Sequence, residues 1–534
     1  MTDHSAVSGS SPTTGPEHLD VLIVGAGISG VGTAYHLQSS HPSRSYAILE
    51  ARQSMGGTWD LFRYPGIRSD SDLPTFAYKW RPWTGDKALA DGQEILDYVH
   101  ETARENGIDK RVRFGHRVIS AAFDSATARW TVEVDRGGEI DTLTCTWLFG
   151  ASGYYRYDEG YTPQFEGVER FTGAGRTVVH PQQWPEDLDY SDKRVVVIGS
   201  GATAVTLVPA MSSGADAAEH VTMLQRSPSY VMTIPSRDVI ANAIRRLLGE
   251  RTAHRIARAK NVWLQRTIFR QSRKRPGFVR RMIRASQKRQ LPRDFDLDTH
   301  FNPSYDPWDQ RLCMVPDGDL FKTISRGDAS VVTDRIETFT ETGLRLESGR
   351  ELEADIIVTA TGLNLLAFGG IDFTVDGQEI DVADTTAYKG MMLSGVPNFA
   401  FAIGYTNASW TLKVDLVGEY FARLLGYMDD AGWAVCNPVV GSDVELRPLL
   451  DFDAGYVQRS LSRFPTQGDR GPWQLTMDYS KDVPLFTEQP IADGALRFSE
   501  AGAAGSEGGR VAGDDPVEVA TGGQGAEGGA PVAA

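Results

Sequence analysis

The sequence predicts an α/β fold with two Rossmann-like dinucleotide-binding domains, because two glycine loops each follow a short apolar run. The first loop spans residues 25–30 and follows Val21–Val24, and the second spans residues 199–204 and follows Val195–Ile198. Glycine lets the backbone turn tightly from a strand into a helix, whose N-terminus can bind a pyrophosphate. The loop glycines are Gly25, Gly27 and Gly30, and then Gly199 and Gly201. Two such loops indicate two dinucleotides, and therefore hydride transfer between a nicotinamide and a flavin.

The first unit continues in the order that a dinucleotide site requires. A helix-like segment, Val31–Gln38, is followed by a second apolar run, Tyr46–Leu49, which ends at Glu50. An acid about 20 residues after the loop can accept a hydrogen bond from a ribose hydroxyl. A surface acid that merely ends the strand is the alternative, and we interpret Glu50 as a cofactor ligand.

The second unit differs at the corresponding position. Its strand-like run, Val221–Gln225, ends with Arg226 and Ser227 in place of an acid. A carboxylate would repel a 2′-phosphate, whereas a guanidinium and a hydroxyl can bind one. We therefore expect FAD in the first unit and NADPH in the second.

The chain is expected to divide into a discontinuous first domain with a second domain inserted in it. We place the FAD-binding domain at 19–155 and 353–499, where it resumes with the strand Asp355–Thr359. The NADP-binding domain is expected at 156–237 and 301–352, and a basic helical insert at 238–300. Residues 1–18 and 500–534 bury too little apolar surface to offset the entropy of ordering, so we expect both to be disordered.

Composition limits the class of protein. The 534 residues are 41% hydrophobic and 23% charged, as in an ordinary soluble globular protein. No apolar run is long enough for a membrane span, and the N-terminus lacks the pattern of a secretory signal. The three cysteines (Cys145, Cys313 and Cys436) are far apart, which suits a reducing cytoplasm and argues against a flavin disulfide reductase. We expect no metal site.

Residues 239–290 contain sixteen Arg or Lys and one acid, Glu250, although the net charge of the chain is −16. Apolar residues recur there at helical spacing, as in Ile240, Ile244 and Leu247. The basic face could be solvated or paired with the acidic remainder, could attract NADPH, or could attach to an anionic membrane surface. We favour the first interpretation and keep peripheral membrane association as the alternative. Nucleic acid is not expected as a partner, because the cofactor loops already account for the chain.

Further segments carry a resemblance to a known family. Phe171-Thr172-Gly173 and His180-Pro181-Gln182-Gln183-Trp184-Pro185 lie between the glycine loops, and Gly56-Gly57-Thr58-Trp59 lies upstream with residues 63–70 after it. These motifs resemble class B flavin monooxygenases, and within them the Baeyer–Villiger monooxygenases. Segments 306–313 and 405–410 resemble mycobacterial members, and the resemblance extends from Leu19 to Phe498. The spacing from Gly173 to His180 is three residues longer than in the family fingerprint.

The resemblance implies roles for individual residues. Those expected at FAD are Ser29, Glu50, Thr58, Trp59 and Asp70, with the backbone of Val118 at the adenine. Those expected toward the nicotinamide are Arg68, Ser69 and Asp70. The NADP pyrophosphate would lie against Ser200, Gly201, Ala202, Thr203 and Ala204, and the 2′-phosphate against Arg226 and Ser227. Gln310 stands where many relatives have a lysine that helps to hold the 2′-phosphate, so preference for NADPH over NADH is expected to be less strict.

The resemblance also implies the chemistry. NADPH reduces FAD, the flavin captures O2 as a C4a-peroxide, and that oxidant converts a ketone into an ester or lactone. Arg311 would supply a fixed positive charge beside the developing anions, and Asp70 would orient it. Oxidation of sulfides or thioamides is expected as a second activity, so the partners are O2 and a small apolar ketone or sulfur compound. His180 and Trp184 are expected to link the domains rather than to catalyse.

Two other functions remain open at this point. One is a class B hydroxylase or S-oxygenase without ketone chemistry, which would not need Arg311. The other is a non-catalytic flavin redox sensor, against which the two complete glycine loops argue. The aromatic residues Phe401, Tyr405 and Trp410 suggest an apolar substrate pocket, although aromatic side chains also build cores.

Overall fold

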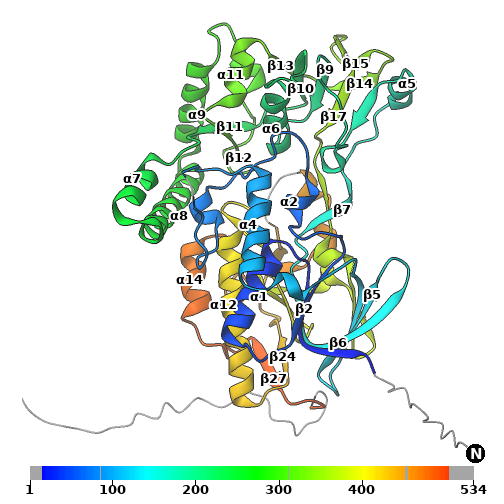
Figure 1. Ribbon diagram of the computed structural model, residues 1–534, viewed down its shortest axis with the longest axis vertical. Helices are drawn as coiled ribbons and strands as arrows, with labels where there is room; N and C mark the ends of the chain where they lie inside the picture. The colour runs from blue at the N-terminus through cyan, green and yellow to red at the C-terminus, as the bar shows by residue number, and fades with distance from the viewer. Residues whose placement is uncertain (1–14, 85, 311, 451–454, 504–534) are drawn as a thin grey trace, which may run out of the picture.

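The computed structural model describes residues 15–84, 86–310, 312–450 and 455–503. These residues form two large sheets, one in the lower and one in the upper half of Figure 1. In each sheet, one strand leads through the glycine loop directly into a helix. The predicted α/β class with two Rossmann-like units is confirmed by this arrangement.

The first sheet has 11 strands in the described part of the chain. Its parallel centre runs β6 (Ile140–Gly150), β1 (Glu17–Val24), β2 (Tyr46–Glu50) and β3 (Val112–Phe114), with β23 (Phe399–Phe401) on the far side of β6. The apolar run of β1 is buried on both faces, which is typical of a parallel strand covered by other layers. The remaining strands are β4 (Arg117–Asp124), β5 (Arg129–Asp135), β19 (Asp372–Val375), β20 (Gln378–Ile380), β21 (Ala387–Tyr388) and β22 (Met392–Leu393).

Three long helices pack together beside this sheet. They are α1 (Ile28–Ser40), α4 (Gly92–Glu105) and α12 (Trp410–Ala431), and Figure 1 shows them side by side. Helix α1 begins within the first glycine loop, with Gly27 as its N-cap.

The second sheet is entirely parallel, in the order β13 (Ala329–Thr333), β10 (His220–Gln225), β9 (Arg194–Ile198), β17 (Ile356–Thr359) and β8 (Thr177–Val179). Helices α6 (Ala202–Met211) and α11 (Asp319–Arg326) cover it. A separate small antiparallel sheet packs against it through a shared apolar cluster; its strands are β14 (Ile336–Phe339), β15 (Gly343–Leu346) and β16 (Glu351–Glu353).

The strand of residues 355–359 corrects one of our assignments. We placed it in the first unit, but Ile356–Thr359 pairs with β9 and β8 of the second sheet. That assignment was wrong because strand pairing, which is non-local, decides sheet membership. We therefore propose that the inserted domain continues to about Gly362 rather than ending at residue 352.

Two antiparallel strands connect the units, β7 (Tyr155–Gly160) leading into the second and β18 (Leu363–Leu365) leading back. His180 bridges them: its Nε2 lies 3.1 Å from the Gly362 carbonyl, and its Nδ1 accepts a hydrogen bond from the Gln182 N–H. Burial lowers the pKa of His180, so the neutral ring is favoured. Trp184 packs against the core of the second unit. The contact of His180 with Gly362 lies at the connection between the units, as a linking residue requires. The linking role stays a prediction for both residues.

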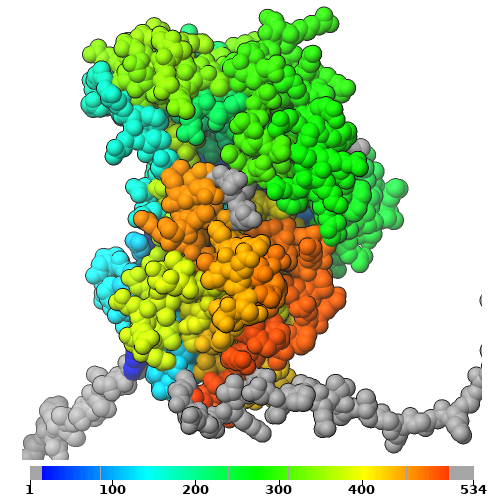
Figure 2. All heavy atoms as spheres, turned by 180° about the vertical axis from the view of Figure 1, so that it is seen from behind, coloured from blue at the N-terminus to red at the C-terminus, as the bar shows by residue number. Residues whose placement is uncertain are grey.

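Residues 239–290 are helical, as the spacing of their apolar residues predicted. They form α7 (Val239–Leu248), α8 (Glu250–Lys274) and α9 (Pro276–Gln290), followed by α10 (Leu297–His300). The strands β11 (Tyr230–Ile234) and β12 (Leu312–Pro316) pair at the base of this insert. Figure 1 shows α7 and α8 projecting from one flank of the molecule, and Figure 2 shows the same flank from behind.

The remaining elements are short. The helices are α2 (Thr58–Leu61), α3 (Leu73–Phe76), α5 (Val168–Gly173), α13 (Gly455–Gln458) and α14 (Tyr479–Thr487). The strands are β24 (Val435–Pro438), β25 (Leu446–Pro448), β26 (Thr466–Gly468) and β27 (Leu496–Ser499). The 3-10 helices are η1 (Asp109–Arg111), η2 (Pro181–Gln183), η3 (Ala367–Gly370), η4 (Val382–Asp384) and η5 (Leu461–Arg463).

Both segments that we predicted to be disordered include residues with regular backbone hydrogen bonds, so the predicted segments are too long. Glu17 and His18 extend β1 by pairing with Leu143 and Thr144 of β6. At the other end, Gly502 donates a backbone hydrogen bond to the Ser125 carbonyl. Residues 1–14 and 504–534, which make up the rest of the two predicted disordered segments, lie outside the described residues.

Candidate functional site: a cavity between two glycine loops

A single large cavity lies where the two units and the helical insert meet. Its volume is about 1000 Å³, and residues of all three parts line it. Gly25 and Gly27 of the first loop and Ala202 and Thr203 of the second lie in its wall. Two loops separated widely in sequence therefore open onto one space, as hydride transfer between two bound dinucleotides would require.

The first loop can exist only with glycine at two of its positions. Gly25 has a φ of +106°, and a Cβ there would lie 2.7 Å from the Ala151 carbonyl oxygen. A Cβ on Gly30 would lie 2.0 Å from the Gly25 carbonyl oxygen. Gly27 is the N-cap of α1 and has no side chain to cap the helix, so the N–H groups of the first turn are left for a ligand.

Glu50 lies at the end of β2, in the wall of the cavity, and its side chain is buried. One carboxylate oxygen accepts the Ala26 N–H at 2.9 Å and the other accepts the Arg52 N–H at 3.0 Å. Burial raises the pKa of Glu50, and the two backbone N–H groups partly oppose that shift. The carboxylate is thus fixed beside the glycine loop with acceptor capacity left over, because each oxygen can accept more than one hydrogen bond.

The other residues expected at FAD lie in the same wall. Ser29 accepts a hydrogen bond from the Trp410 indole at 2.8 Å, and the Thr58 hydroxyl lies 3.2 Å from that of Tyr157. Trp59 packs edge-on against Phe76, with 5.8 Å between ring centroids. Val118 at the start of β4 also lines the cavity. The structure therefore gathers the four predicted positions Ser29, Thr58, Trp59 and Val118 in one place.

Arg68, Ser69 and Asp70 form a stretch of wall that faces the second unit. Arg68 makes an ion pair with Asp319, the first residue of α11, with 2.6 Å between Nη1 and Oδ2. Its Nη2 is buried without a hydrogen-bond partner among the described residues. The Ser69 hydroxyl is occupied within its own loop, by the N–H and carbonyl of Ser71.

The second loop has the same strand-to-helix turn with less crowding. Gly199 has a φ of +143°, and a Cβ there would lie 2.3 Å from the Ala360 carbonyl oxygen. Gly201 is the N-cap of α6, and nothing lies within 4 Å of a Cβ built on it. Ala204 is fully buried in the core of the unit, so its side chain packs and contacts no ligand in the cavity.

Ser200 connects this loop to the end of β10. Its hydroxyl donates to the Ser227 carbonyl at 3.1 Å and lies 2.8 Å from the Ser229 hydroxyl. Arg226 and Ser227 are exposed there and do not belong to the cavity wall. The predicted 2′-phosphate residues are therefore next to the loop but on the outer surface of the second unit.

Arg311, the residue we expect beside the reacting carbonyl, lies outside the described residues. Of its chain neighbours, Trp308, Leu312 and Met314 line the cavity, whereas Gln310 does not. Asp70 lines the same cavity.

Sequence reasoning missed the contribution of the insert to this wall. Asn261 and Gln265 of α8 line the cavity and both donate to the Asp72 carboxylate, at 2.6 and 2.5 Å. Burial raises the pKa of Asp72. Of the three aromatic residues suggested for a pocket, Tyr405 and Trp410 line the cavity, whereas Phe401 is buried in the core. No local pattern distinguishes these cases, because each depends on packing between distant segments.

The described residues contain neither a cluster of metal ligands nor a membrane-spanning helix. No group of three or more His, Cys, Asp or Glu side chains could hold a metal ion there. Among the helices of those residues, none is both long enough and apolar enough to cross a membrane.

The flavin-binding monooxygenase-like family matches residues 87–392, and an NAD(P)-binding Rossmann-like domain matches residues 23–82. The chain belongs to the flavin-binding monooxygenase-like family and is a flavin-dependent monooxygenase. In particular, it is 57% identical over 485 residues to the FAD-containing monooxygenase EthA of Mycobacterium tuberculosis, covering 91% of this chain and 98% of that protein. The predicted family, enzyme class and two cofactor classes, a flavin and a nicotinamide dinucleotide, are confirmed.

Solved structures show the same fold. An oxidized steroid monooxygenase bound to NADP matches with a TM-score of 0.67 and 24% identity, over 79% of this chain and 88% of that chain. An open crystal structure of cyclohexanone monooxygenase matches with a TM-score of 0.65 and 20% identity, over 79% and 90%. At this level of identity the likeness supports the two-domain architecture and nothing finer.

Proposed function

We propose that this protein is an NADPH- and O2-dependent Baeyer–Villiger monooxygenase of the cytoplasm, which converts small apolar ketones into esters or lactones. The observation that carries the proposal is the single cavity onto which both glycine loops open, with Glu50 in its wall beside the first loop. S-oxygenation of sulfides or thioamides is proposed as a second activity.

The residues of the first unit fit FAD. The turn at Gly25 and Gly30 leaves no room for a Cβ, and the first turn of α1 offers unpaired N–H groups to a pyrophosphate. Glu50 would accept a hydrogen bond from the ribose. When bound, FAD takes a hydride from NADPH and activates O2, which is chemistry that no side chain of the cavity can supply.

The residues of the second unit fit NADPH. The first turn of α6 begins at Ala202 in the cavity wall, and Gly201 leaves its N–H groups accessible. Arg226 and Ser227 lie at the end of the neighbouring strand β10, where the phosphate on the adenosine ribose would reach. Arg68 lies in the cavity wall and pairs with Asp319 of the second unit, so it stands between the two cofactor sites.

We assign substrate activation to Arg311, with Asp70 as its orienting carboxylate. An arginine keeps its proton at any working pH and donates in a rigid fork, so it can stabilise negative charge that develops on the carbonyl oxygen. The cavity wall contains apolar side chains such as Ile67, Met232 and Phe368. An apolar wall excludes water and strengthens the electrostatic effect of a fixed charge.

The test is incubation of the purified protein with NADPH, 18O2 and a panel of ketones and sulfides, followed by mass spectrometry. The expected product is an ester or lactone with one labelled oxygen, together with a labelled sulfoxide from the sulfides. Labelled sulfoxide without any ester would establish an S-oxygenase and overturn the ketone assignment. Oxidation of NADPH without label in any product would overturn both.

A further inference from the structure

The insert carries a concentration of exposed apolar side chains. Of the twelve large apolar side chains that are exposed in the described residues, eight lie between residues 240 and 282. Six of them belong to α7 and α8, and we call these the apolar face: Ile240, Leu247, Leu248, Ile256, Trp263 and Leu264. Leu247 is 82% exposed and Trp263 is 64% exposed. A patch of this kind on one flank marks an interaction site rather than chance exposure.

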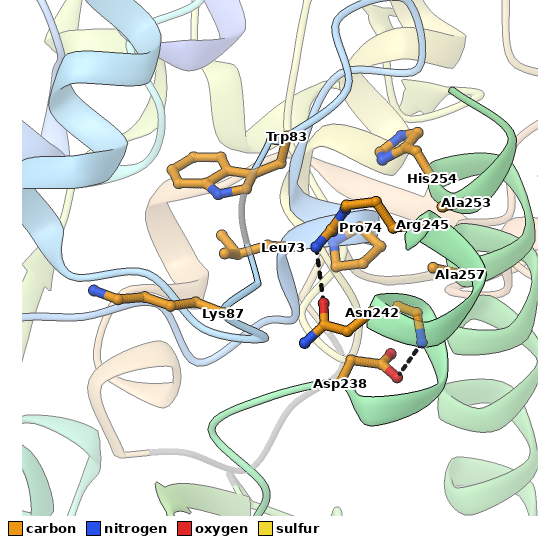
Figure 3. Close-up of a pocket in the computed structure, with 11 residues that line it drawn as sticks. Leu73, Pro74, Trp83, Lys87, Asp238, Asn242, Arg245, Ala253, His254 and Ala257 are labelled. Carbon is orange, nitrogen blue, oxygen red and sulfur yellow. Dashed lines mark hydrogen bonds between the residues drawn. The ribbon is translucent and has the colours of Figure 1, made fainter. Parts of the chain in front are cut away.

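The way α7 packs explains why this face remains open. Figure 3 shows that α7 approaches α8 and the segment around Pro74 through Asn242 and Arg245, near His254. The Arg245 guanidinium donates to the Asn242 side chain at 2.8 Å within this contact. Ile240 and Leu247 are two turns apart, so they share a stripe on the side of the helix that carries no such contact.

Unpaired basic side chains lie on the two helices of the apolar face and on α9, which follows them. Eight of the sixteen basic side chains of residues 239–290 make ion pairs, for example Arg266 and Arg270 with Asp478. The other eight are exposed and make no salt bridge with the described residues. They are Arg246, Arg251, Arg255, Lys274, Arg275, Arg281, Lys288 and Arg289. Three of the eight ion pairs use acids of the insert itself, Asp238, Glu250 and Asp298, and the other five use acids elsewhere in the chain. The eight unpaired basic side chains are available to an anionic partner.

The apolar face is continuous with the cavity. Ile240 and Leu264 are 60% and 44% exposed and at the same time line the cavity. Ile268, one turn after Leu264 on α8, continues the lining inward. An apolar molecule that left a lipid phase at this face would meet apolar side chains along its way to the site.

We propose that the apolar face of α7 and α8 docks on an anionic lipid bilayer and that apolar substrate enters the cavity from the bilayer, between Ile240 and Leu264. The substrate part of this inference rests on the proposed function, since it requires an apolar substrate. Interleaved basic and apolar side chains on helices are the composition that interfacial membrane helices use. A bilayer suits this flank better than a second copy of the chain, because each copy would bring the unpaired positive charges of α7 and α8, among them Arg246, Arg251 and Arg255, to the contact.

Docking is tested by flotation of the full-length holoenzyme with vesicles of phosphatidylglycerol and phosphatidylcholine, and with phosphatidylcholine alone. We expect binding to the anionic vesicles that falls as salt is added, because screening weakens charge attraction. The variant Leu247→Asp/Trp263→Asp should bind at least tenfold more weakly. The matched control is Ile140→Asp/Leu446→Asp, which changes two side chains with 52% and 53% exposure outside the insert and should bind normally.

The charge contribution is tested separately. Arg246→Glu/Arg251→Glu/Arg255→Glu should weaken binding on the order of a hundredfold, since each basic side chain near an anionic surface contributes roughly fivefold. Arg129→Glu/Arg497→Glu, at exposed strand positions elsewhere, should leave binding unchanged. Equal binding of all variants would overturn docking through this face. Conversion of a dimer to a monomer in the apolar-face variant, without any vesicle binding by the parent protein, would assign the face to self-association instead.

The entry route is tested with two ketones, one with a long alkyl chain carried in vesicles and one short and soluble in water. The apolar-face variant should raise the apparent KM for the vesicle-borne ketone about tenfold and leave the soluble ketone unaffected. Loss of both activities or of neither would overturn the route. If the parent protein oxidises neither ketone, the proposed function fails while the flotation result still decides docking.

Discussion

The two dinucleotide-binding units use the same turn, but the first encloses its glycine loop and the second leaves it open. In the first, Gly30 lies so close to the Gly25 carbonyl that no other residue fits, and Glu50 is 6% exposed. In the second, alanine replaces glycine at position 204, and Arg226 lies on the surface. A buried ligand set releases its cofactor slowly, whereas an exposed one allows exchange. We infer that the first unit holds a resident cofactor and that the second exchanges its cofactor in every turnover.

The difference between the two units also bears on how each one achieves affinity and specificity for its cofactor. In the first unit the loop, the acid and the helix N-terminus form one packed group, so a change at any of them should affect retention of the cofactor. In the second unit the Ser200 hydroxyl ties the loop to the segment of Ser227, while Arg226 makes no ion pair with the described residues. Recognition of the 2′-phosphate is therefore separable from binding of the pyrophosphate.

The largest expected effect comes from Arg311→Ala. FAD retention and reduction by NADPH should continue, because both units stay intact, while ester formation falls by about 10²–10³ or more. Reduced flavin should then react unproductively and release hydrogen peroxide. Stopped-flow reduction, a peroxide assay and ester quantification on one preparation measure this. Arg289→Ala, an exposed arginine of α9, is the control, and normal ester formation in Arg311→Ala would remove that residue from the mechanism.

The second largest effect is expected from Gly30→Ala, and comparison with Gly201→Ala distinguishes the two glycine loops. Gly30→Ala places a Cβ 2.0 Å from a backbone oxygen, so the turn must shift, and overpacking of this kind costs about 1–3 kcal/mol. The variant should be purified with little flavin, visible as lost absorbance near the flavin bands. Gly201→Ala has open space around the new Cβ and a negative φ, so the turn should not shift and flavin should be retained. Binding of NADPH should weaken, because the new methyl group would lie where the pyrophosphate approaches the backbone. Equal loss of flavin in both variants would break the comparison.

Much of this comparison could be predicted from the sequence, because it rests on local patterns. The strands before Gly25 and Gly199, the helices after them, and the different residues at Glu50 and Arg226 are all read from short segments. Each segment can be recognised from its own residues: an apolar run, a turn that accepts only glycine, and a charged residue at a fixed number of residues after the turn.

What could not be predicted depends on contacts between distant segments. Ile356–Thr359 is an apolar strand in either sheet, and only its pairing with β9 places it in the second. Tyr405 lines the cavity, whereas Phe401 lies in the core, because β23 ends between them. Asn261 reaches the cavity because α8 packs on the loop of Asp72. Periodicity locates such helices and strands but does not say against what they pack.

A smaller effect is expected from Arg226→Ala. Loss of one charge-assisted hydrogen bond to phosphate should raise the KM for NADPH about ten- to hundredfold, because such bonds contribute roughly 1.5–3 kcal/mol. The KM for NADH should change little, and flavin content should not change. Steady-state kinetics with both nucleotides measure this, with Arg497→Ala as the control on a distant exposed strand. Equal losses for NADPH and NADH would show that Arg226 does not contact the 2′-phosphate.

The smallest effect should come from Asp319→Asn, at the contact that joins the units. Its carboxylate pairs with Arg68 at 2.6 Å, and both side chains are partly buried, at 29% and 14% exposure. Neutralising one partner of such a pair should cost about 1 kcal/mol, because water still screens it partly. We expect a rise of a few fold in the KM for NADPH, since Arg68 loses its anchor to α11, and no loss of flavin. Asp328→Asn is the matched control, because Asp328 pairs with Arg326 inside the second unit. A fall in flavin content with an unchanged KM would show that the contact stabilises the first site instead, and that the two units are less independent than their loops indicate.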